Sequence, residues 1–128
     1  ERVIGLRSNQ VSGRLVRITR FMAIAFAVFL MLFSLDVFGM GGSVLQKIAG
    51  FLIHSLPSLA IAAILALTWR KPFCSGLSFL LLAVLFTFMF GTYDRVGTFI
   101  MLSGVPGLIG VLFLLASRRQ AAEPIVRQ

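Results

Sequence analysis

The sequence predicts an all-α fold: a polytopic integral membrane protein with four transmembrane helices and both termini in the cytoplasm. Hydrophobic residues make up 59% of the 128 residues and charged residues only 12%, too few to cover a water-facing surface. The apolar residues gather in four runs, each near the ~20 residues that a helix needs to cross the hydrocarbon core. When the four runs are taken as membrane spans, most basic residues fall on one side of the membrane, and this sets the expected orientation of the chain.

The four runs follow one another with short breaks between them. They cover about 15 or 18 to 38, about 44 to 69, roughly 73 to 93 and roughly 96 to 117. Helices are expected, because backbone polar groups in lipid must be satisfied within the segment. The breaks carry turn or charge signals: GMGG at 39–42, RKP at 70–72 and YDRVG at 93–97.

Three regions result from this threading. We predict a cytoplasmic N-terminal segment over residues 1–14, a four-helix transmembrane domain over 15–117 and a cytoplasmic tail over 118–128. The first apolar run ends in SLDVFGMGG, which lacks an A-x-A cleavage pattern. We therefore expect it to remain as a helix and not to be removed as a signal peptide.

Orientation follows from the basic residues. Ten of the twelve Lys and Arg fall on the side of the termini and the 70–72 loop, and two, Lys47 and Arg95, on the other. The positive-inside rule places the first side in the cytoplasm. Seven of the ten are expected to anchor in lipid headgroups, anionic ones included: Arg14, Arg17, Arg20, Arg70, Lys71, Arg118 and Arg119.

The net charge of +8 would suggest nucleic acid if the basic residues formed a soluble face. They flank apolar runs instead, so no nucleic-acid partner is expected. The expected location is a cell membrane, crossed several times, of the prokaryotic inner or plasma type. The expected partners are the bilayer and either a second copy of the chain or a larger membrane complex.

The stretch FLIHSLPSLA, residues 51–60, places a histidine, two serines and a proline within the second run. A small-residue stripe that lets another helix approach recurs every four residues: Gly50, His54, Ser58, Ala62 and Ala66. We therefore expect His54 to point into the bundle. Pro57 leaves the carbonyl of residue 53 without its helical donor, and Ser55 or Ser58 is expected to satisfy it.

Asp36, His54 and Ser58 form the candidate intramembrane polar site. An ionisable residue within a membrane is a functional candidate, and Asp36 would meet His54 across the first hairpin and tune its proton affinity. The structural alternative is a neutral histidine that hydrogen-bonds for packing while Asp36 caps its helix. Helix kinks are expected at Pro57 and at Pro106, the latter within SGVPG at 103–107.

No catalytic, cofactor-binding or metal-binding residues are predicted. One histidine, one distant cysteine and few acids make a poor ligand set for a metal. The single cysteine, Cys74, excludes a disulfide within the chain. No nucleophile–base pair or phosphate-binding loop is present in the sequence, so an enzyme is not expected.

Two motifs carry a family resemblance. The segment LFSLDVFG, followed by LIHSLPSLA and then by Trp69 and Arg70, resembles a family of small uncharacterised prokaryotic four-helix membrane proteins, a domain of unknown function. In that family an L-D-V-F segment ends the first helix and an H-x-x-P segment lies in the second. The resemblance implies four helices and no known activity.

The sequence supports two functional hypotheses. The first is a non-enzymatic accessory, structural or assembly component of the membrane, suggested by small-residue faces on the helices. The alternative is a small transporter or channel that uses the region of His54 and Asp36.

Overall fold

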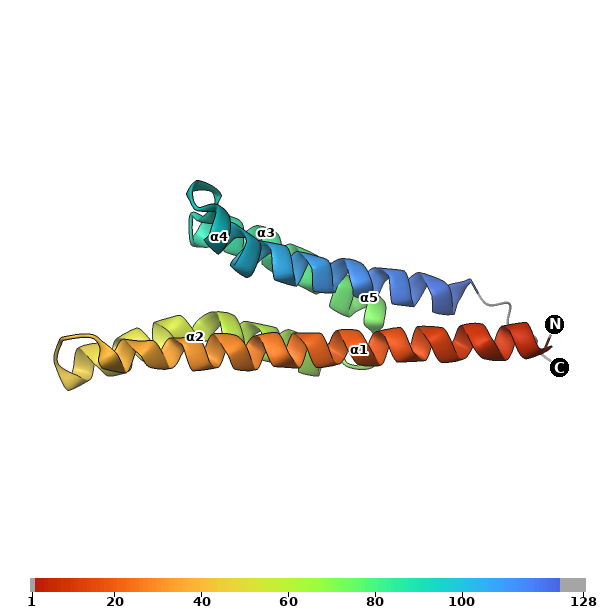
Figure 1. The fold of residues 1–128 in the computed structure, drawn as a ribbon, viewed down its shortest axis with the longest axis horizontal. Helices are drawn as coiled ribbons and strands as arrows, with labels where there is room; N and C mark the ends of the chain where they lie inside the picture. The colour runs from red at the N-terminus through yellow and green to blue at the C-terminus, as the bar shows by residue number, and fades with distance from the viewer. Residues whose placement is uncertain (1, 123–128) are drawn as a thin grey trace.

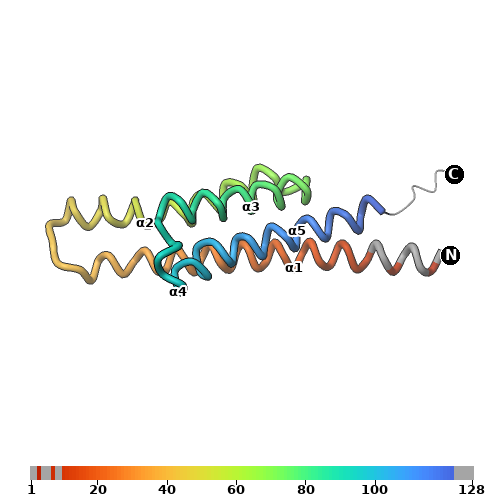
Figure 2. The backbone as a smooth tube through the Cα atoms, turned by 90° about the horizontal axis from the view of Figure 1, so that it is seen from above, coloured from red at the N-terminus to blue at the C-terminus, as the bar shows by residue number. Residues whose placement is uncertain are grey.

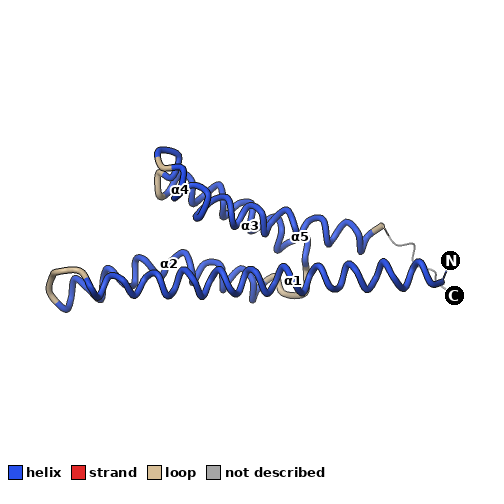
Figure 3. Tube along the Cα trace, in the orientation of Figure 1, coloured by secondary structure: helices blue, strands red, loops and turns tan. Residues whose placement is uncertain are grey.

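The computed structural model describes residues 2–122 as a succession of helices joined by short turns (Figures 1 and 3). Besides the α-helices it contains two 3-10 helices, η1 and η2, and one π-helical turn, η3. In chain order the elements are α1 (Arg2–Ser34), η1 (Leu35–Gly39), α2 (Val44–Leu67), α3 (Pro72–Met89), η2 (Thr92–Asp94), α4 (Val96–Phe99), η3 (Ile100–Gly104) and α5 (Val105–Ala121).

The all-α class and the four long apolar helices are confirmed. Within the described residues, four helical stretches are long and apolar enough to cross a membrane: Gln10–Gly39, Val44–Leu67, Pro72–Met89 and Val96–Ala121. The fourth is composite, because α4, η3 and α5 follow one another without a break. In η3 the N–H of Val105 donates to the carbonyl of Ile100, five residues back, which is the π-helical pattern.

The first helix begins much earlier than its apolar run. α1 is helical from Arg2, so the boundary expected at residue 15 is not the start of a helix. Val16 and Thr19 are buried while Arg14 and Arg17 are exposed. The basic part of α1 is therefore amphipathic, and one face packs inward while its arginines point outward.

The helices form two layers. α1 and α2 make one antiparallel pair, and α3 and α5 make the other (Figure 1). Viewed from above, α5 lies over α1 and α3 lies over α2 (Figure 2). The layers touch mainly through α1 and α5, and they diverge toward the end that holds the α1–α2 and α3–α4 turns.

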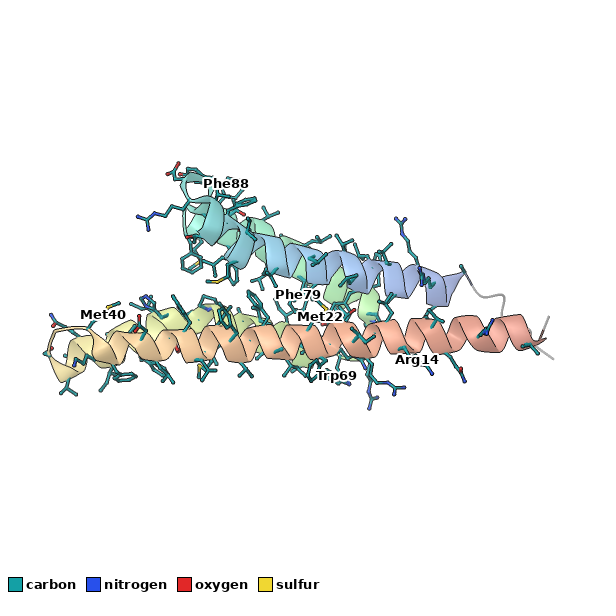
Figure 4. The ribbon with its side chains drawn as sticks, in the orientation of Figure 1. Arg14, Met22, Met40, Trp69, Phe79 and Phe88 are labelled. Carbon is teal, nitrogen blue, oxygen red and sulfur yellow. The ribbon has the colours of Figure 1, made fainter. Side chains whose placement is uncertain are left out.

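The core lies where the layers meet. Phe79 and Phe113 stack with ring centroids 5.8 Å apart, and both are essentially fully buried. Figure 4 shows Phe79 between the two layers. α3 and α5 approach closely because glycines face each other: a Cβ on Gly76 would lie 2.9 Å from the carbonyl oxygen of Gly110.

The outer surface is strongly apolar. Large hydrophobic side chains are exposed on every long helix, among them Leu67, Leu45, Phe88 and Leu81. Phe88 extends from the outside of the upper layer in Figure 4. Water-soluble monomers rarely expose such continuous apolar surface, whereas hydrocarbon accepts it. The distribution is consistent with a multi-pass membrane protein.

The ends of the molecule follow the predicted threading. α1 begins and α5 ends at the same end, and the α1–α2 and α3–α4 turns lie at the other (Figure 1). The first turn is closed by a capping box between Ser43 and Gln46, and Lys47 Nζ donates to the carbonyl of Phe38 at 3.2 Å. In the second turn Gly91 has φ +55°, a conformation that favours glycine.

Candidate intramembrane polar site

His54 projects from the core side of α2 but is not covered. Pro57 and Ile61 follow it at helical spacing on the same side, and both are buried. His54 itself is exposed. The layers diverge toward the end of α2 on which it lies (Figure 1), so α3 and α5 do not reach it. The expectation that His54 points into a packed bundle is therefore wrong.

The imidazole of His54 bonds to its own helix. Its Nδ1 lies 2.9 Å from the carbonyl oxygen of Gly50, one turn earlier. A carbonyl oxygen only accepts, so Nδ1 carries the proton in this contact. Within the described residues Nε2 has no hydrogen-bond partner, and no hydrogen bond or ion pair joins His54 to Asp36. Asp36 is exposed in η1.

Ser58 has a different role from the one expected. Its hydroxyl donates to the carbonyl of Ala27 at 2.7 Å and so ties α2 to α1. Ser55 donates to the carbonyl of Phe51 and lies 3.2 Å from the hydroxyl of Ser34. Neither serine bonds the carbonyl of residue 53 that Pro57 leaves free. The predicted three-residue site is thus not assembled: its members bond to separate backbone groups or face outward.

The small-residue stripe on α2 is divided between two environments. Gly50 faces η1, where a Cβ would lie 2.8 Å from a methyl of Val37, and Ser58 is buried against α1. Ala62 and Ala66 are exposed. The face that packs within the chain is instead the buried set Ser55, Pro57, Ser58, Ile61 and Leu65.

A second polar cluster lies in the upper layer. Thr87 donates to the carbonyl of Ala83 at 2.8 Å, and the hydroxyls of Thr87 and Thr92 lie 2.8 and 3.2 Å from that of Ser103. Thr92 and Ser103 are buried. Thr87 and Ser103 lie within the third and fourth apolar runs, where a hydroxyl stands out among hydrophobic neighbours. Thr92 was missed, because a turn residue shows no helical periodicity and only the αL turn at Gly91 brings it inward.

An open cavity of about 410 Å³ adjoins this cluster at the α3–α4 turn. It is lined by Phe90, Gly91, Thr92, Asp94, Arg95 and Thr98. Pro106 is the second residue of α5, just after the π-helical turn, and Ser103 lies within that turn. Departures from α-helical bonding therefore coincide with the buried hydroxyls of the upper layer.

The predicted headgroup anchors lie toward the end where α1 begins and α5 ends. Arg14, Arg17, Arg70, Lys71, Arg118 and Arg119 are exposed. Arg20 is half-buried, because its guanidinium stacks 4.4 Å from the ring centroid of Trp69 and donates to the Trp69 carbonyl. This cation–π contact links α1 to the end of α2 and holds an aromatic ring beside basic groups.

Metal-ligating side chains do not converge in the described part of the chain, where no group of three or more His, Cys, Asp or Glu could hold an ion. Cys74 is half-buried at the start of α3.

Comparison with known proteins gives a family and no activity. A family model described as Domain of unknown function (DUF7670) matches residues 8–124. No curated protein matches the chain. No solved structure matches it either.

Proposed function

Since the chain belongs to the DUF7670 family of unknown function, we propose that it is a non-enzymatic structural or assembly component of a membrane, which packs against a second copy or a larger membrane complex. Its four apolar helices are long enough to span a bilayer. The orientation proposed is that of the charge rule, with both termini in the cytoplasm.

The observation that carries this proposal is the uncovered core side of α2 around His54. Ile53 and His54 are exposed there because the two layers diverge. An imidazole acceptor without a partner is costly in hydrocarbon, and intramembrane ionisable residues usually face protein or water. A helix from a partner that entered between the layers would supply the missing hydrogen bond and cover the apolar surface.

Cysteine cross-linking tests this proposal. In a Cys74→Ser background, His54→Cys is expected to form a disulfide-linked species with a second copy or a cysteine-bearing partner after mild oxidation in native membranes. Leu81→Cys on α3, which is 70% exposed to the outside of the upper layer, is the matched control. Equal cross-linking at both positions, or none at position 54 together with a monomer in mild detergent, would contradict the proposal.

A small transporter or channel is the second candidate. The observation that favours it is the same exposed His54, whose uncovered imidazole could instead meet water. Flux of protons, ions or small solutes into liposomes distinguishes the two. Flux that is lost in His54→Ala while the oligomeric state stays unchanged would favour transport over a structural role.

A further inference from the structure

A groove runs between α1 and α2 on the face of the lower layer that is turned away from α3 and α5. It has a volume of about 450 Å³, within the about 300–1,000 Å³ typical of ligand sites. Trp69 closes one end, and Figure 4 shows Trp69 on the side of this layer away from the upper one. The lining residues are Ile24, Ala27, Val28, Met31, Ser58, Leu59, Ala62, Leu65, Ala66 and Trp69.

The lining is suited to a hydrocarbon chain. Ser58 is its one hydroxyl-bearing side chain, and that hydroxyl is already bonded to the Ala27 carbonyl. An occupant therefore needs no polar groups along most of its length. Ala62 and Ala66 keep the floor of the groove open, because larger side chains at these positions would fill it.

The length of the groove matches one leaflet. From Ser58 to the end of α2 at Leu67 the α2 wall rises ~14 Å at 1.5 Å per residue, and Trp69 lies just beyond that end. Half of a ~30 Å hydrocarbon core is ~15 Å. A partner helix is a poor fit, since ~14 Å of a helix ~10 Å across occupies about 1,100 Å³, far more than the groove.

The Trp69 end of the groove is basic. Arg17 lies on the same face of α1 as Ile24 and Met31, which follow it at heptad spacing. Arg20 stacks on Trp69, and Arg70 and Lys71 come directly after it. Among the described residues no acid lies at this end, because Asp36 and Asp94 are in the turns at the opposite end.

We propose that the α1–α2 groove binds one acyl chain of an anionic phospholipid, whose phosphate is held by Arg17, Arg20, Arg70 and Lys71. The apolar lining receives the chain, and the positive charge of these four residues selects the headgroup. The site is thus a defined lipid position, beyond the general attraction of basic residues to a membrane surface, and His54 is not among its lining residues.

Lipid titration of the purified full chain, followed by native mass spectrometry, tests the proposal with phosphatidylglycerol and phosphatidylcholine as probes. Phosphatidylglycerol should bind more tightly. Arg17→Gln with Arg20→Gln should weaken it by about five-fold per charge removed. Arg118→Gln with Arg119→Gln, at the same end but on α5, should weaken it much less, because these two arginines lie outside the groove.

Substitutions that fill the groove test whether it holds the acyl chain. Ala62→Phe should lower the occupancy of bound lipid, while Ala63→Phe, exposed on the same helix but outside the groove, should not. If Ala62→Phe does not fold, the proposal is still tested by Ala66→Phe and by the two double-arginine variants. Equal affinity for the two lipids, equal effects of the matched variants, or loss of a dimer in Ala62→Phe with lipid binding unchanged would overturn the proposal.

Discussion

Gly76 on α3 and Gly110 on α5 face each other so closely that a Cβ on either would lie 2.9 Å from the other's carbonyl oxygen. This contact brings the two backbones of the upper layer together and allows Phe79 and Phe113 to stack beside it. In hydrocarbon, where burial of apolar surface does not drive association, such close backbone packing is a main source of helix–helix affinity.

Gly110→Ala is expected to lower the stability of the fold by about 1–3 kcal/mol, the usual cost of overpacking, because the clash is with backbone. Gly107→Ala is the control, since its Cβ would meet the Cβ of Ala83 at an ordinary 3.7 Å. That variant should be neutral or slightly more stable. Thermal unfolding in detergent, followed by circular dichroism, measures both; a similar loss in the two variants would contradict this packing.

Ser103→Ala should cost about 1 kcal/mol, because it removes the shared partner of Thr87 and Thr92, at roughly 0.6 kcal/mol for each bond between membrane helices. Combining it with Thr92→Val should cost less than the sum of the single changes. Thr98→Val, which alters a hydroxyl lining the nearby cavity, is the comparison. Additive costs in the double variant would show that the two hydroxyls are not coupled.

His54→Ala should leave the unfolding free energy of the monomer within about 0.5 kcal/mol, since the ring bonds only to its own helix. Ser58→Ala should destabilise the monomer more, because it removes the bond to the Ala27 carbonyl. Association of the chain with a second copy, measured by light scattering in mild detergent, should be weakened more by His54→Ala than by Ser58→Ala. A large loss of monomer stability in His54→Ala would mean that the ring is buried in the folded chain.

Both termini and the 70–72 loop should lie in the cytoplasm, on the basis of the distribution of basic residues. Single cysteines at positions 41, 71 and 95, in a Cys74→Ser background, report the topology through labelling by an impermeant maleimide on intact cells. Gly41 suits the first turn, because a side chain there would begin in open space, with no neighbouring atom within 4 Å of its Cβ. Position 71 should be protected and the other two labelled; the opposite pattern would reverse the orientation.

The sequence by itself determined the four apolar helices and the turns between them. Hydropathy, the glycines of the first turn and Pro72 before α3 are local properties, and a helix is the form in which such a segment can satisfy its own backbone. Gly76 and Gly110 are visible in the sequence as small residues within the third and fourth apolar runs, but their contact is not. The start of α1 at Arg2 was not predicted, because the many basic residues of this segment mask the helical spacing of its buried residues Val16 and Thr19.

Only the tertiary structure decided which side of each helix is covered. Lipid and protein interior are similarly apolar, so a residue such as Ala62 or His54 carries little signal of the direction in which it points. The divergence of the layers leaves His54 exposed, and the turn at Gly91 brings Thr92 to Ser103. Both depend on how the helix pairs meet in space, which periodicity within a single helix does not contain.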